Sequence, residues 1–340
     1  GTVPSSWEPY APIERFTYHF GFHTLSAWTH WLSGAAVSRS VVLVGQVINA
    51  LVVPTSYLFA SRLCRSRFAG LVAASALGLF SHMPALYVNW GRYPQLTGLI
   101  LLPVLLVVTI EALDLDENRF NLWLLAGIGV AGMFLVHIRV FLFYGIFVCL
   151  WLLYRLVAAG RGRKLDQVKH LLLGCAVIGA VALLLLTPWF LRFFDGFGSM
   201  IAGELSGGYQ PERHGSYFRW RAQDLVAFGL PLWLLLLAAA GGLWGILKRN
   251  INIMLLMAWL LALFAAANTH LIGILPLYSN LVATISLYLP AATLFGYLTG
   301  ELAGRAERAH IGSGSRLPRR MMQWVMVLAL ILIGLLGARY

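Results

Sequence analysis

Arginine and histidine residues lie next to long apolar segments of this sequence, where they could bind a phosphate group. Arg92 is in the turn NWGRYPQ, and Arg139 follows His137 in a second short turn. A guanidinium group is permanently charged and offers two parallel N–H donors, which match two oxygens of a phosphate. If the apolar segments span a membrane, charged residues beside them are costly and usually serve a site. The two arginines therefore predict a phosphate site; the alternative is that they extend to lipid headgroups.

The opening segment WEPYAPIERFTYHFGFH supplies carboxylates and imidazoles. Glu8 and Glu14 are candidates for a general base that takes the proton of an attacking hydroxyl group. His19 and His23 are four residues apart and would share one face of a helix. Such a pair can hold a metal ion, but the glutamate of an HExxH motif is absent, so no metal site is predicted.

The complete set of candidate residues is polar or aromatic and falls in segments that we expect at one end of a helical bundle. The candidate bases are Glu8 and Glu14, and the candidate substrate-binding residues are Tyr18, His19, His23, Asn89, Arg92, Tyr93, Gln95, His137, Arg139, Tyr209, Arg213 and His214. Aromatic residues among them could stack on the faces of a sugar. The alternative for the tyrosines and neighbouring tryptophans is an aromatic belt at the membrane surface.

The composition excludes an ordinary soluble domain. Of the 340 residues, 59% are hydrophobic and 11% are charged, whereas soluble domains carry about 25% charged residues. The mean hydropathy of +0.77 and repeated apolar runs indicate an all-α, polytopic membrane protein. Cys64, Cys149 and Cys175 are far apart, so neither a disulfide framework nor a metal knuckle is predicted.

About ten transmembrane helices are expected, because each needs roughly 20 apolar residues. The predicted spans are residues 39–61, 68–87, 94–113, 121–137, 140–158, 170–191, 224–246, 251–267, 277–299 and 321–337. Residues 20–33 are too short to span and predict a helix along the membrane interface. The whole chain, 1–340, is interpreted as one transmembrane domain. An external loop with the interfacial helix covers 1–38, and a long external loop covers 188–224.

The orientation of the chain in the membrane follows from the loops in which its basic residues fall. Most of them fall in one set of loops, which the positive-inside rule places in the cytoplasm. The net charge of +12 is therefore a topology signal, and binding of nucleic acid is not predicted. The opposite loops, with the candidate residues, are expected outside the cytoplasm. Because the sequence opens at Gly1 in a polar loop, we also expect at least one helix upstream of it.

The run from Tyr18 to Gln95 resembles the GT-C class of polytopic membrane glycosyltransferases. The order is an external segment, FTYHFGFHTLSAW, then a span, VVLVGQVINALVVPTSYLFASRL, a basic turn, CRSR, and a small-residue span, FAGLVAASALGLF. The resemblance is to the mannosyl-, arabinosyl- and aminoarabinose-transferase group, and in particular to its uncharacterised prokaryotic members. The sequence departs from the YPPxxH pattern of the class, because His19 and Phe20 replace the two prolines.

The resemblance implies an inverting hexosyl- or pentosyltransferase of the cell envelope. Its donor would be a polyprenyl-phosphate sugar, and its acceptor a glycan, a lipid or a protein. The reaction would take place on the extracytoplasmic face of a prokaryotic plasma membrane. In this class the base is an acidic residue of the first external loop, near the end of the first helix. Two places for it stay open: upstream of Gly1, or at Glu8 or Glu14, which would then act as stand-ins. No external DxD motif is present, so no cofactor is expected and a divalent metal is not supported.

Two other functions remain open from the sequence. A transporter or flippase for a lipid-linked saccharide would favour inverted repeats and polar residues at mid-membrane, and neither is apparent. An inactive scaffold subunit with a GT-C-like fold would share the same helices without the chemistry.

Overall fold

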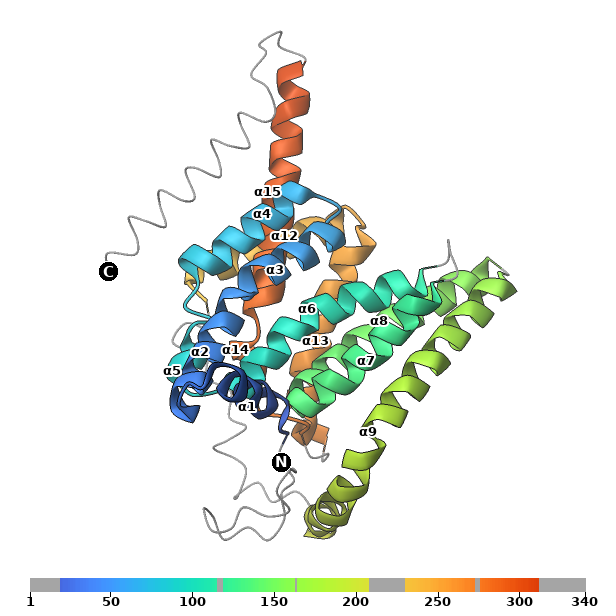
Figure 1. Cartoon of the computed structure of the whole chain (residues 1–340). Coiled ribbons are helices and arrows are strands. Elements are labelled where there is room, and N and C mark those ends of the chain that lie inside the picture. The colour runs from blue at the N-terminus through green and yellow to red at the C-terminus, as the bar shows by residue number, and fades with distance from the viewer. Residues whose placement is uncertain (1–18, 115–118, 163, 208–229, 273–275, 312–340) are drawn as a thin grey trace.

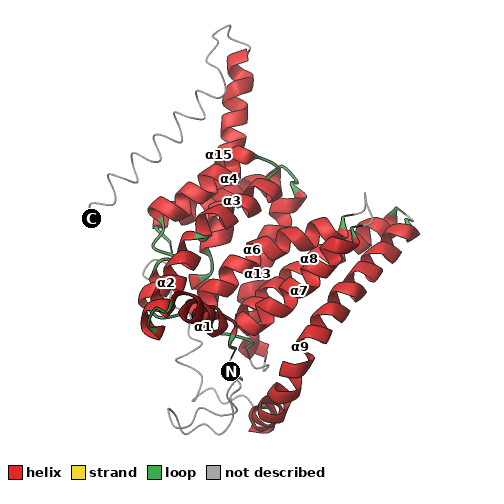
Figure 2. Ribbon diagram, in the orientation of Figure 1, coloured by secondary structure: helices red, strands yellow, loops and turns green. Residues whose placement is uncertain are grey.

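The computed structural model describes residues 19–114, 119–162, 164–207, 230–272 and 276–311. Within these ranges the chain forms helices joined by short loops, without a strand (Figure 2). The elements are α1 Gly21–Ser33, α2 Val37–Ala50, α3 Val52–Leu63, α4 Arg67–Ser75, the π-helical turn η1 Ala76–Phe80, α5 Leu86–Asn89, α6 Tyr93–Leu113, α7 Phe120–Val136, α8 Ile138–Arg161, α9 Leu165–Gly207, α12 Leu232–Leu247, α13 Ile251–Ala267, the 3-10 turn η2 Thr269–Ile272, α14 Asn280–Ile285 and α15 Tyr288–Ile311.

Four helical stretches in the described part of the chain are long and apolar enough to cross a membrane: Val37–Leu63, Tyr93–Leu113, Ile138–Arg161 and Leu165–Leu191. They indicate a membrane protein. The expected number of about ten spans is not confirmed, because the shorter apolar helices of the described part have only 10–17 residues. The predicted span 321–337 lies outside the described residues. A helix of 17 residues such as α7 is about 25 Å long, which is shorter than the roughly 30 Å of a hydrocarbon core.

Three predicted boundaries differ from the structure. Residues 277–299 were expected as one span, but α14 ends at Ile285 and α15 begins at Tyr288, which puts Pro290 in a first helical turn, where its missing N–H is tolerated. Residues 68–87 were also expected as one span, but the helix ends at Phe80. In contrast, helix α9 continues through 188–207, a stretch assigned to the long loop from its polarity.

Helix α6 is the centre of the fold. In its span 67% of the residues are buried, against 22–28% in the other three, and it is apolar on every side. Helices α3, α7 and α8 pack directly on it, and α9 covers α7. On the other side, α4, α12 and α15 pack together, and α13 joins them to α8. Figure 1 shows α7, α8 and α9 on one side of α6, and α3, α4, α12 and α15 on the other.

The bundle has two polar ends. Helices α6 and α8 both begin at one end, which we call the Arg92 end. A Cβ atom on Gly98 of α6 would lie 3.1 Å from Val140 and 3.3 Å from His137, so the two helix starts pack closely. At the opposite end, which we call the Glu111 end, α3 and α6 finish and α4 and α13 begin. Helix α1 lies across the Arg92 end and contacts α6 and α7 (Figure 1).

Candidate functional site

His137 is the single residue that separates α7 from α8. Its backbone is extended, with φ −165° and ψ 108°, and its carbonyl oxygen accepts hydrogen bonds of 3.1 Å from the amides of Val140 and Phe141. This sharp turn directs the chain back along α7. The His137 side chain is only 7% exposed, and its Nδ1 atom has no hydrogen-bond partner among the described residues. A buried ring nitrogen of this kind is available to a ligand.

His19 lies against His137. The centroids of the two imidazole rings are 4.6 Å apart, and the rings meet edge to face. The contact depends on the close approach of α1 to α7, because a Cβ atom on Gly21 would lie 2.6 Å from Cγ2 of Val136. Glycine at this position is therefore required for the start of α1 to rest on the end of α7.

Arg92 lies at the start of α6. Gly91 adopts the left-handed region with φ +65°, which glycine permits, and the amide of Arg92 donates a 2.9 Å hydrogen bond to the carbonyl of Tyr87. The Arg92 guanidinium is 5.4 Å from the centroid of the Trp90 ring. This cation–π contact helps to position the charge at the end of the helix, and no carboxylate among the described residues forms an ion pair with it.

The pKa values of the two imidazoles reflect their burial and the positive charges near them. Burial, followed by the charges of His23 and Arg139, lowers the pKa of His19 from 6.5 to about 4. Burial lowers the pKa of His137 well below its ordinary value, and His19, Arg139 and Arg92 lower it further. Both imidazoles are therefore neutral at neutral pH, and each can donate one hydrogen bond and accept another. The positive charge of the cluster comes from Arg92 and Arg139.

Aromatic packing fixes α1 over this cluster. The ring of Phe22 stacks on Tyr93 with centroids 5.2 Å apart, and Tyr93 lies against Gly45 of α2. Phe20 meets Trp189 of α9 edge to face at 5.0 Å. Phe22 and Gly21 were not among the sequence candidates, although a glycine between two phenylalanines is a signal for close helix packing. Trp28 and Trp31 are exposed on α1, which favours the predicted place along the interface.

The remaining candidates lie elsewhere or outside the described residues. Gln95 is 4% exposed and donates its amide N–H to the Tyr87 hydroxyl at 3.5 Å; that hydroxyl in turn donates to the carbonyl of Ile285. Gln95 therefore joins α5, α6 and α14. Asn89 is exposed at the end of α5, and His23 is exposed on α1. The candidates that lie outside the described residues are Glu8, Glu14, Tyr18, Tyr209, Arg213 and His214.

The cluster of Arg92, Arg139, His19 and His137 can bind an anion. Two helices begin there, and a helix start carries a partial positive charge and free N–H groups. Arg139 is the second residue of α8, so its charge adds to that helix start. Among the described residues, no group of three or more His, Cys, Asp or Glu is arranged to hold a metal ion, and the expected absence of a metal stays a prediction.

Comparison with curated proteins finds none that matches this sequence. Among solved structures, the fold is similar to the archaeal oligosaccharyltransferase AglB from Archaeoglobus fulgidus, in a complex with an inhibitory peptide and a dolichol-phosphate. The TM-score is 0.59 and the sequence identity is 14%, over 97% of this chain and 48% of that chain. This chain thus spans about half the length of that protein. At this identity the similarity concerns the fold, and it agrees with the expected GT-C-like architecture. The model of a family of unknown function (DUF6541) matches residues 5–335, and the chain belongs to that family.

Proposed function

We propose that the protein transfers a sugar from a polyprenyl-phosphate donor to a glycan, lipid or protein acceptor. The observation that carries this proposal is the position of the buried His137 imidazole, whose centroid lies 4.6 Å from that of His19. His137 directly precedes α8, which carries Arg139 as its second residue, and it packs against Gly98 in the second turn of α6, the helix that Arg92 precedes. Both charges lie at the ends of apolar helices, where the phosphate of a membrane-embedded lipid would be found. The dolichol-phosphate in the AglB complex belongs to that protein and supports a lipid-phosphate ligand here by similarity of fold.

The proposed reaction requires charge stabilisation at the leaving group. The acceptor oxygen forms a bond to the anomeric carbon of the sugar while the bond from that carbon to the phosphate oxygen breaks. Negative charge then builds up on the phosphate, and fixed donors placed beforehand lower the barrier. Arg92 and Arg139 supply the charge, and the free Nδ1 of His137 supplies a neutral hydrogen-bonding group beside them.

The acceptor hydroxyl must lose its proton in the same step. Glu8 and Glu14 remain the proposed bases, and attack from the face opposite the phosphate gives inversion. Tyr209, Arg213 and His214 remain proposed ligands of the sugar or acceptor. We place the reaction on the extracytoplasmic face of a prokaryotic plasma membrane, because the basic residues concentrate in the opposite loops.

A transfer assay tests the proposal. The full-length protein in nanodiscs receives a panel of polyprenyl phosphates with radiolabelled hexoses or pentoses, together with glycan, lipid and protein acceptors. Arg92→Ala and Arg139→Ala are each expected to lower turnover by about a hundredfold or more, the usual effect of losing one charge-stabilising donor. Arg39→Ala is the matched control, because Arg39 is exposed near the start of α2 and has no place in the cluster.

Three results would contradict the proposal, the first in its phosphate site and the other two in its transferase activity. Turnover that survives in both arginine variants would refute the phosphate site. Movement of the intact donor across the membrane without transfer would establish the flippase alternative. Binding of the donor with neither transfer nor movement would establish the scaffold alternative.

A further inference from the structure

A large cavity opens at the Glu111 end, on the side of the bundle away from the His137 cluster. It has a volume of about 710 Å³ and is lined by the last turns of α3 and α6, the first turns of α4 and α13, and the second half of α8. This volume is within the range of about 300–1,000 Å³ that is typical of small-molecule sites. Basic residues at this end had been attributed to membrane orientation alone.

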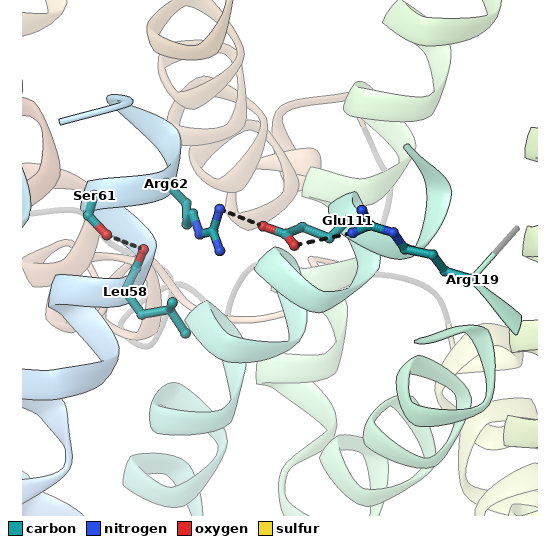
Figure 3. A network of polar contacts seen from close by, with 5 residues as sticks. All are labelled: Leu58, Ser61, Arg62, Glu111 and Arg119. Atoms are coloured by element: carbon teal, nitrogen blue, oxygen red, sulfur yellow. Dashed lines mark hydrogen bonds and ion pairs between the residues drawn. The ribbon is translucent and has the colours of Figure 1, made fainter. Parts of the chain in front are cut away.

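The two carboxylates that line the cavity are already paired. Glu111 lies between Arg62 and Arg119, at 3.2 Å and 3.8 Å (Figure 3). Asp114 pairs with Arg155 at 3.2 Å, and the Arg155 guanidinium also lies over the Trp151 ring. These pairs hold Arg62 and Arg155 in fixed positions on the wall of the cavity.

Two further arginines of the lining, Arg65 and Arg67, have no ion pair with a described carboxylate. Arg65 has a φ of +51°, a left-handed conformation that is unfavourable for residues other than glycine. Ser66 follows and accepts a 3.2 Å hydrogen bond from the amide of Ala69, which caps α4. The turn is therefore well defined. The lining as a whole carries four arginines against two carboxylates, which leaves an excess of positive charge.

The helix ends do not alter this balance. Helices α3 and α6 finish at the cavity with the negative ends of their dipoles, and α4 and α13 begin there with the positive ends. Because these contributions oppose each other, the side chains decide the sign of the potential. The cavity is therefore suited to an anion.

The cavity changes in character from its mouth to its floor. The Arg62 side chain at the mouth is 62% exposed, whereas Phe59 and Phe147 at the floor are fully buried and meet edge to face. A bare phosphate would fill only a small part of this volume. The matching ligand has a phosphate for the arginines and a further group for the apolar floor.

We propose that this cavity is a second phosphate-binding site, which takes a phosphate monoester attached to a larger group. The monoester belongs to a lipid or to a soluble compound, and its dianion provides the oxygens that Arg65 and Arg67 bind. The site lies at the end of α6 opposite to Arg92 and does not depend on the proposed transfer reaction.

The experiment counts bound equivalents by calorimetry, with the full-length protein in phosphatidylcholine nanodiscs. Citronellyl phosphate is the lipid-like probe, and glycerol 3-phosphate is the soluble probe. The wild type is expected to bind two equivalents of citronellyl phosphate. Arg65→Gln with Arg67→Gln should lose the equivalent at the Glu111 end or weaken it at least tenfold, and Arg92→Ala with Arg139→Ala should lose the other. Arg161→Gln is the control, because Arg161 is exposed at the end of α8 and does not line the cavity.

A second variant tests the sign of the charge. Glu111→Gln removes one negative charge and releases Arg62 and Arg119, so it should tighten phosphate binding severalfold. Thermal unfolding of each variant shows whether the fold is intact. If glycerol 3-phosphate binds at the same site, a soluble ligand is assigned, and if only citronellyl phosphate binds, a lipid is assigned. An unchanged second equivalent in the Arg65 and Arg67 variant, weaker binding in Glu111→Gln, or no binding of either probe at this end would overturn the proposal.

Discussion

Protonation of His19 should loosen α1 from the bundle. The pKa of His19 is about 4 in the folded protein and 6.5 as the ordinary value, so the unfolded or detached segment binds a proton first as the pH falls. Stability is therefore fully present above pH 6.5 and is lost as the pH falls towards 4. The loss arises because a charged imidazole is costly in this buried position and beside His23 and Arg139.

The size of the effect follows from the two pKa values. A tenfold change in proton affinity corresponds to about 1.4 kcal/mol, so the change from 6.5 to about 4 sets an upper limit of about 3 kcal/mol. Because part of the ring is open to solvent, screening reduces this to about 1–2 kcal/mol. Opening of α1 should therefore become about five to thirty times more frequent between pH 7 and pH 4.

Hydrogen exchange of the α1 amides between pH 4 and pH 7.5, corrected for the intrinsic rate, measures this opening. His19→Gln keeps a polar side chain of similar reach without the titration, and it should flatten the profile of α1. The amides of α6 serve as the internal control, since α6 is central and remote from solvent. If α1 opens with the same pH dependence in the wild type and in His19→Gln, the reasoning is refuted.

Three predictions concern packing and buried hydrogen bonds. Gly296→Ala should lower the free energy of unfolding by about 1–3 kcal/mol, because its new Cβ would lie 2.3 Å from a backbone oxygen of α4. The control Gly145→Ala places its Cβ in open space and should leave the free energy of unfolding unchanged. Thermal unfolding measures both. Trp259→Phe should lower the free energy of unfolding, measured in denaturant titrations, by about 1–3 kcal/mol. The variant loses the buried 2.9 Å hydrogen bond that the indole N–H donates to the carbonyl of Phe143 in α8. Asn268→Ala should lower the free energy of unfolding by about 1–2 kcal/mol in the same titrations, since the Asn268 and Asn280 amides form two 2.8 Å hydrogen bonds with each other. The double variant with Asn280→Ala should lose less free energy of unfolding than the sum of the two single losses.

The helices were predictable where an apolar run ends in polar residues on both sides. The predicted span 94–113 matches α6, Tyr93–Leu113, because turns with Arg92 and Asp114 close it at each end. The break after Ile285 was not predictable, since residues on both sides of it are apolar and buried and hydropathy alone does not register a turn inside the protein.

The candidate site, like the helices, was predictable from the sequence only in part. Arg92, His137 and Arg139 could be grouped from the sequence, because they follow from the order of the spans. The inward direction of the Gln95 side chain could not be predicted, because it depends on Tyr87 and, through the Tyr87 hydroxyl, on α14. The cavity at the Glu111 end could not be inferred, because a basic turn such as CRSR has a sufficient explanation in membrane orientation.

The one-residue connection at His137 leaves no slack in chain length between α7 and α8. Insertion of one residue there would rotate α8 by about 100° around its axis and turn Arg139 away from the imidazoles. Deletion would rotate it in the opposite sense. Proteins of this family should therefore keep a fixed residue count across this junction.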